Sequence, residues 1–294
     1  MFSFSEIVGH EQIKEHMQAA IRDKKPFHAY LFQGEEGVGK EALARTFAAG
    51  LQCQSESADK PCKECVSCRQ MESGNQPDVI WVTREKASLG VDEIREQLCN
   101  TMDIKPFSSP YKIYLVPEAE KMTEAAQNAL LKTIEEPPEY GIVILMTSNI
   151  SALLPTIQSR CLTMEFRPLS TAVVESYVKE HCQVPDYQAR ASAAFAQGNL
   201  GKAMRYAKSE DFIERKDHII SLLRHVEQMD LSEMLAVIKD LGTRKDEVRD
   251  YIEASHRSYE KIEEILQAFE KAKVRLRANV NFDITMELML LTLK

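Results

Sequence analysis

Four of the seven cysteines lie close together in the sequence and could bind a metal ion. They follow the spacing C-x8-C-x2-C-x2-C, at Cys53, Cys62, Cys65 and Cys68. The two short steps form tight turns that direct three thiolates to one point, and Cys53 can supply the fourth. Four sulfur ligands suit a structural Zn²⁺ ion in a closed tetrahedral site. An iron–sulfur cluster also uses closely spaced cysteines, but nothing in the sequence indicates electron transfer, so zinc is the favoured metal.

A second group of residues could bind a polyphosphate. The segment from Gly34 to Lys40 fits the phosphate-binding pattern G-x-x-x-x-G-K. Gly34, Gly37 and Gly39 let the backbone turn its N–H groups towards phosphate, and the N-terminus of the following helix adds a favourable dipole. Lys40 would reach the terminal phosphates. ATP or ADP is therefore a candidate ligand, although a glycine turn that binds nothing fits the same residues.

The same loop lacks both residues that would hold a magnesium ion. The position after Lys40 is normally Ser or Thr, whose hydroxyl ligates the metal, and here it is Glu41. An ATPase also needs an acidic residue at the end of its third strand. Pro117 stands there, followed by Glu118. Without a bound metal, Glu118 has no attacking water to activate, so the sequence predicts a site that does not hydrolyse nucleotide.

Arg160 is the third candidate for chemistry, within Gln158-Ser-Arg-Cys161. A lone arginine is usually a solvated surface residue. An arginine that reaches into a neighbouring subunit can instead stabilise the charge on a phosphoryl group during its transfer. The short motif alone does not decide between the two interpretations.

Strands that alternate with helices predict how these residues are positioned. Short apolar runs indicate buried strands at 29–32, 78–82, 113–116, 142–146 and 162–166. Helical spacing of apolar residues indicates helices at 40–51, 91–102 and 123–135. This order predicts an α/β domain with a mostly parallel sheet. After Pro168 only helices are expected, first at 171–182 and 187–206 and then from 211 to 294.

Composition limits the class of protein. With 294 residues, 44% hydrophobic, the chain is expected to be a soluble globular protein of about two or three domains. No apolar run is long enough for a membrane helix, and the N-terminus does not resemble a signal peptide, so a cytoplasmic location is expected. A net charge of -8 argues against a stand-alone nucleic-acid binder. The odd number of cysteines argues against a disulfide framework, and Cys99, Cys161 and Cys182 are expected to be buried small residues.

Together these motifs resemble those of bacterial clamp-loader subunits, the AAA+ proteins of the DNA polymerase III holoenzyme. The resemblance covers residues 1–208 strongly and the remaining helices only by length and pattern. Its most specific part is 128–137, Asn-Ala-Leu-Leu-Lys-Thr-Ile-Glu-Glu-Pro. The other matching segments are 7–9, 28–32, 34–40, the four-cysteine insertion and 159–161.

Within that family, the replaced magnesium contacts resemble those of a non-hydrolysing subunit. The motor subunits (gamma/tau) have an intact phosphate loop, an Asp-Glu pair and an arginine in a Gly-Ser-x-Arg segment. In this chain 198–203 aligns with that segment, and Gly201 takes the place of the arginine. The resemblance implies that Arg160 serves the ATP of the next subunit. The implied partners are gamma/tau and delta subunits, with the sliding clamp and primer–template DNA contacted through the complex.

The resemblance also implies three domains. These are an AAA+ P-loop-type domain at 1–167 with a zinc module at about 52–70, a helical lid at 168–208, and a helical collar for oligomerisation at 209–294. Two other functions remain open on the residues alone. One is an active gamma/tau-type ATPase with an unusual magnesium site, and the other is a zinc-dependent nucleic-acid-binding protein, against which the acidic charge weighs.

Overall fold

The computed structural model of the chain describes residues 3–57 and 59–209, together with the single positions 212, 271 and 275. Contacts divide the chain into one unit that ends at Pro168 and another that starts at Leu169. The predicted collar at 209–294 lies almost entirely outside the described residues. The limits of the three proposed domains therefore stay a prediction.

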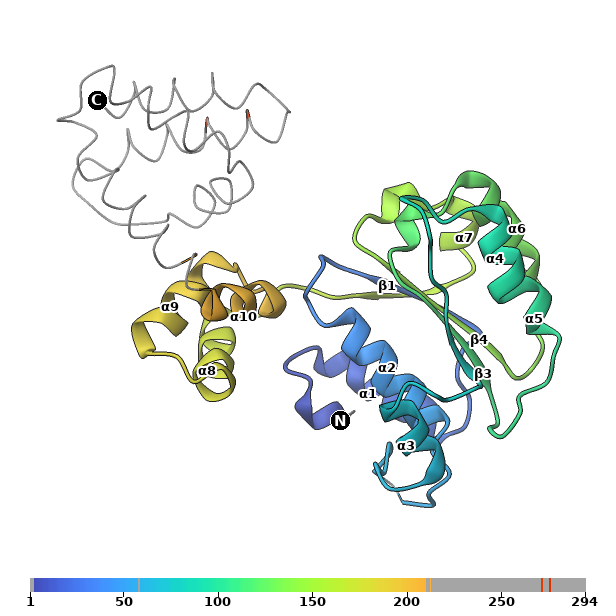
Figure 1. Cartoon of the computed structure of the whole chain (residues 1–294), viewed down its shortest axis with the longest axis horizontal. Helices are drawn as coiled ribbons and strands as arrows, with labels where there is room; N and C mark the ends of the chain where they lie inside the picture. The colour runs from blue at the N-terminus through green and yellow to red at the C-terminus, as the bar shows by residue number, and fades with distance from the viewer. Residues whose placement is uncertain (1–2, 58, 210–211, 213–270, 272–274, 276–294) are drawn as a thin grey trace. The chain divides into compact units, whose positions relative to one another are not determined.

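A five-stranded sheet forms the centre of the first unit (Figure 1). All of its paired strands are parallel, in the order β2-β3-β4-β1-β5. The strands are β1 (Ala29–Gln33), β2 (Val79–Trp81), β3 (Lys112–Val116), β4 (Gly141–Thr147) and β5 (Leu162–Glu165). The predicted parallel α/β fold is confirmed.

Alternating side chains of the central strands build a separate core on each face of the sheet. Tyr30 and Phe32 of β1 belong to one cluster of buried residues, whereas Leu31 between them belongs to the other. Every residue of β3 and β4 is buried, as expected for strands covered by helices on both faces. A strand covered by helices on both faces needs apolar side chains at nearly every position, which explains the apolar runs in the sequence.

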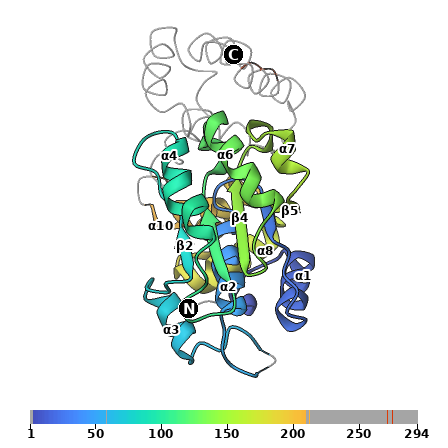
Figure 2. The same ribbon diagram turned by 90° about the vertical axis from the view of Figure 1, so that its right-hand side faces the viewer.

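Helices cover both faces. Those on one face are α1 (Glu11–Arg22) and α2 (Lys40–Leu51), followed by α3 (Val66–Glu72) in the cysteine segment. Those on the other face, turned towards the viewer in Figure 2, are α4 (Val91–Ile94), α5 (Asn100–Met102), α6 (Glu124–Glu135) and α7 (Pro155–Gln158). A π-helical segment, Arg95–Cys99, joins α4 to α5, so the helix predicted at 91–102 is continuous.

The second unit begins with three helices: α8 (Thr171–Cys182), α9 (Asp186–Phe195) and α10 (Leu200–Lys208). The stretch predicted as helical at 187–206 is divided into two helices, because the chain turns between α9 and α10. Gln197 and Gly198 have φ angles of 48° and 85°, which a continuing right-handed helix does not allow. Asn199 then accepts a hydrogen bond from the Lys202 N–H at 3.1 Å and starts α10.

Candidate functional site

The loop from Gly34 to Lys40 joins β1 to α2 and has the shape that a phosphate-binding loop needs. Gly39, directly before α2, has a φ of 104°, which side chains other than glycine rarely adopt. At Gly34 a Cβ atom would lie 2.8 Å from the Cβ of Phe166, so only glycine fits there. No side chain of the described residues caps the start of α2, and its N–H groups are suited to an anion.

Lys40 lies in this loop, and its ammonium group is hydrogen-bonded to the loop's own backbone. Its Nζ atom donates hydrogen bonds to the carbonyl oxygens of Gly34 and Glu35, the latter at 2.8 Å. Burial lowers the pKa of Lys40, and the nearby carboxylates, Glu120 first, oppose this shift. The two hydrogen bonds leave one of the three N–H donors of the ammonium group for a bound phosphate, unless the phosphate displaces a carbonyl.

The carboxylate of Glu41 is bound by another side chain of α2. It forms an ion pair with Arg45 one turn further along α2, at 2.9 Å between Oε1 and Nη2. The guanidinium of Arg45 in turn lies over the ring of Trp81, 4.4 Å from its centroid, a favourable cation–π geometry. Glu41 is therefore part of a surface cluster, and no hydroxyl stands where the sequence pattern expects a magnesium ligand.

Glu118, the acidic residue that follows Pro117, is also engaged elsewhere. Its backbone is left-handed, with a φ of 46°, and its carboxylate forms an ion pair with the guanidinium of Arg84. Arg84 also donates a 2.6 Å hydrogen bond to the carbonyl of Ala87. A carboxylate neutralised in this way is poorly placed to activate a water molecule.

Glu120 belongs to this region but to none of the motifs visible in the sequence. Its Oε1 atom accepts hydrogen bonds from the N–H and hydroxyl of Ser148, at 3.3 and 2.5 Å. Burial raises the pKa of Glu120, but these hydrogen bonds outweigh burial and the net pKa is lowered. Glu120 follows β3 and Ser148 follows β4; β3 pairs with β4, and β4 pairs in turn with β1, the strand that leads into the loop. A fixed negative charge thus lies near Lys40, where it disfavours a second anion such as a triphosphate.

The four cysteines predicted to bind metal are brought together. Their sulfur atoms all lie within 4.8 Å of one another. The Sγ atoms of Cys62 and Cys68 are 4.0 Å apart, close to the roughly 3.8 Å that tetrahedral Zn–S bonds of about 2.3 Å would give. Cys53 follows α2, whereas Cys65 caps α3 and Cys68 lies in its first turn.

Backbone donors surround the sulfur atoms of this cysteine cluster. The N–H groups of Cys62, Cys65 and Cys68 point to the sulfurs of Cys53, Cys62 and Cys65 respectively, each at 3.4 Å. Burial opposes ionisation of the Cys62 thiol, yet backbone donors, that of Cys65 first, lower its pKa to about 6. A donor set of four sulfurs with N–H groups aimed at them fits a metal ion bound by thiolates.

Arg160 lies far from the chain's own phosphate loop. Leu162, two residues later, pairs with Tyr30 at the start of β1, whereas the loop leaves the other end of that strand. A five-residue strand spans roughly 17 Å at about 3.3 Å per residue. The structure therefore separates Arg160 from Lys40 by the length of the sheet.

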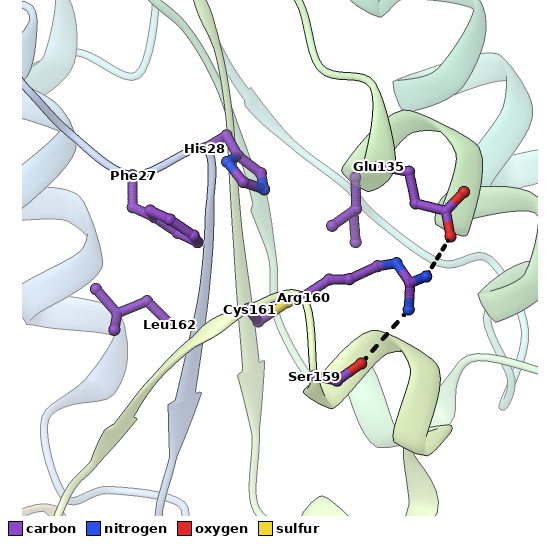
Figure 3. A pocket seen from close by; sticks show the side chains of 8 residues that line it. Phe27, His28, Glu135, Ser159, Arg160, Cys161 and Leu162 are labelled. Atoms are coloured by element: carbon purple, nitrogen blue, oxygen red, sulfur yellow. Dashed lines mark hydrogen bonds and ion pairs between the residues drawn. The ribbon is translucent and has the colours of Figure 1, made fainter.

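A pocket of about 370 Å³ lies beside Arg160 at this amino-terminal edge of the sheet (Figure 3). The residues lining it are Phe27, His28, Ile134, Glu135, Ser159, Arg160, Cys161 and Leu162. The Arg160 guanidinium extends towards Glu135 at the end of α6, and the Nη2–Oε1 distance is 2.7 Å. Its Nη1 atom donates to the carbonyl of Thr156 at 2.9 Å. Glu135 carries no signal of this role in the sequence, because it lies in another element.

Comparison with known proteins gives the relatives of this chain. The family described as "DNA polymerase III, delta subunit" matches residues 9–170. The tau subunit of DNA polymerase III from Bacillus subtilis is 37% identical over 206 residues, 68% of this chain and 36% of the relative. The tau/gamma subunit from Haemophilus influenzae is 33% identical, over 81% of this chain and 34% of the relative. The chain thus spans about a third of the length of these two relatives.

Another relative belongs to a different type of subunit. The delta' subunit of DNA polymerase III from Bacillus subtilis is 32% identical over 212 residues, 71% of this chain and 62% of the relative. Among solved structures, the RuvB Holliday junction branch migration motor from Thermotoga maritima matches with a TM-score of 0.51 at 15% identity, over 99% of this chain and 90% of RuvB. That match shows a shared fold. No helix among the described residues is long and apolar enough to cross a membrane.

Proposed function

The chain belongs to the clamp-loader family of DNA polymerase III subunits, and on that premise we propose that it is the non-hydrolysing, delta-prime type of subunit. Relatives of both the tau/gamma and the delta' type match it, so identity does not choose between them. One observation carries the proposal. At the chain's own phosphate loop the usual hydroxyl ligand of magnesium is replaced by Glu41, which is paired with Arg45, and the usual acidic ligand by Pro117, while Arg160 lies at the opposite edge of the sheet.

This arrangement supports a complex in which one subunit holds the ATP and this chain, as its neighbour, supplies the arginine. Arg160 would stabilise the γ-phosphate charge of an ATP held by the adjacent subunit, because its planar guanidinium can bridge two phosphate oxygens. The chain's own loop would bind ATP or ADP weakly or not at all, since Glu120 lies near Lys40. Hydrolysis in the complex would then be carried out by gamma/tau subunits.

The remaining parts of the proposal concern partners and metal. The chain would assemble with gamma/tau and delta subunits in the cytoplasm and help load the sliding clamp on primed DNA through the whole complex. The cysteine cluster would hold one structural Zn²⁺ ion, which fits its sulfur geometry. The helices after Pro168 would supply the lid and the collar.

An active gamma/tau-type ATPase is the second candidate function. Two observations favour it: the 37% identity to a tau subunit, and a phosphate loop that keeps its glycines and Lys40. The ion pairs that occupy Glu41 and Glu118 weigh against it.

The isolated chain is expected to release no phosphate from ATP above background. The physical reason is that the carboxylate of Glu41 is paired with Arg45 and Pro117 has no ligand atom in its side chain, so the magnesium ion that phosphoryl transfer needs lacks both usual contacts. Steady-state phosphate release with magnesium, with and without clamp and primed DNA, measures this directly. Lys40→Ala is the matched control. Turnover that disappears in this variant would show a working site and favour the gamma/tau type.

A further inference from the structure

The charge of Arg160 is compensated inside the subunit. Glu135, the last residue of α6, places Oε1 at 2.7 Å from Nη2 of Arg160. On the other side of the guanidinium, Nη1 donates to the Thr156 carbonyl at 2.9 Å and lies 3.4 Å from the Ser159 hydroxyl. Two of the three guanidinium nitrogens are therefore held by the chain itself (Figure 3).

Backbone packing, rather than chance side-chain positions, brings Glu135 and Arg160 together. Gln127 of α6 donates to the Ala152 carbonyl at 3.0 Å and accepts from the Leu154 N–H at 2.7 Å. These bonds fix α6 against the segment that leads into α7. Because α6 ends at Glu135 and α7 ends at Gln158, two residues before Arg160, rotation of the two side chains is enough to open the pair.

We propose that Glu135 holds the guanidinium of Arg160 within the isolated subunit and releases it to the terminal phosphate of the neighbouring subunit's nucleotide. This inference rests on the proposed role of Arg160 in the adjacent site. Glu135 is then a positioning residue, since it acts only through Arg160. It would limit ATP hydrolysis until clamp and DNA bring the two subunits together.

The ion pair between Glu135 and Arg160 is weak enough for a phosphate group to displace Glu135. Its side chains are 38% and 45% exposed, and pairs this exposed shift an equilibrium by roughly fivefold at most. A bidentate bond from arginine to phosphate is stronger than a single bond between exposed groups. A correctly placed phosphate can therefore take the guanidinium from Glu135.

Among the described residues that line this pocket, Glu135 is the only one with an acidic side chain. His28, on the opposite wall, has its pKa lowered by burial, so it adds little positive charge near neutral pH. The hollow of about 370 Å³ beside the pair gives the guanidinium space to turn.

The test measures ATP hydrolysis by the reconstituted clamp loader that contains this chain. Glu135→Gln keeps the size of the side chain and removes its charge. We expect the kcat without DNA to rise about two- to fivefold, because the pair holds the guanidinium back by up to that factor. The rate with clamp and primed DNA should stay near that of the wild type, and KM for ATP should change less than the kcat without DNA. The matched control, Glu136→Gln, removes the adjacent exposed carboxylate and should leave both rates unchanged.

The double variant Glu135→Gln/Arg160→Ala distinguishes this inference from the proposed function. If Glu135 acts through Arg160, the double variant should hydrolyse ATP like Arg160→Ala alone. If Arg160→Ala lowers hydrolysis but Glu135→Gln leaves the DNA-free rate unchanged or lowers it, the holding role of Glu135 is overturned and the role of Arg160 stands. If Arg160→Ala has no effect, the proposed role of Arg160 fails. A rise with Glu135→Gln that persists in the double variant would overturn the inference, because Glu135 would then act by another route.

Discussion

Removal of the metal from the cysteine cluster is expected to unfold the segment around 53–72 while the parallel sheet stays folded. This segment has little core of its own, and ordering its backbone costs on the order of 1–2 kcal/mol per residue. Zinc bound by small cysteine and histidine sites supplies about 10–16 kcal/mol near pH 7. We therefore expect the metal to account for most of the local stability.

Metal analysis of the purified chain should give one zinc per chain, and Cys65→Ser should lower this value. Hydrogen exchange should then become fast at Cys62, Cys65 and Cys68 and stay slow in β3 and β4. Cys182→Ser, at a thiol outside the cluster, is the matched control and should keep the zinc. Stoichiometric iron with visible absorbance would point to an iron–sulfur cluster, and an unchanged exchange pattern in the metal-free chain would contradict a structural role.

The sheet was predictable because its three central strands, β1, β3 and β4, are buried on both faces. Runs such as Ile142–Met146 are apolar at every position, which parallel strands between two helical layers require. The order of the strands was not predictable, because it depends on which crossovers pack best. The stretch 187–206 was predicted to be helical without a division, and the turn between α9 and α10 lies at Gly198-Asn199 within it.

The candidate sites were predictable as far as their residues are local in sequence. The cysteines within 53–68 and the loop at 34–40 each follow a fixed spacing, and the structure brings the members of each together. The charged partners were not predictable. Glu120 meets Ser148 because β3 and β4 are neighbours, and Glu135 meets Arg160 because α6 packs against the segment before α7. Which charged residues meet depends on contacts between separate helices and strands, and the spacing of residues along the chain does not show these contacts.

Replacement of Arg160 by alanine is expected to lower ATP hydrolysis and clamp loading by the complete complex. Under the proposed function, the phosphate partner of Arg160 lies in another subunit, because the chain's own loop is at the other end of β1. Arginine fingers contribute about 10³–10⁵ in rate at a single site. In the proposed complex the other ATP sites have arginines of their own, so we expect a fall of roughly two- to tenfold in DNA-stimulated hydrolysis.

The lower rate of ATP hydrolysis should reflect a slower chemical step and not a failure of the complex to assemble. Arg160→Ala should keep the zinc content, the thermal stability within the range of a surface substitution, and the elution position of the complex. Arg160→Lys should recover little activity, because lysine keeps the charge but lacks the planar fork. Arg167→Ala is the matched control, since Arg167 is an exposed arginine paired with Glu165 in the same unit. A complex that assembles with Arg160→Ala and hydrolyses ATP at the wild-type rate would make Arg160 an ordinary surface residue, held by Glu135 for stability alone.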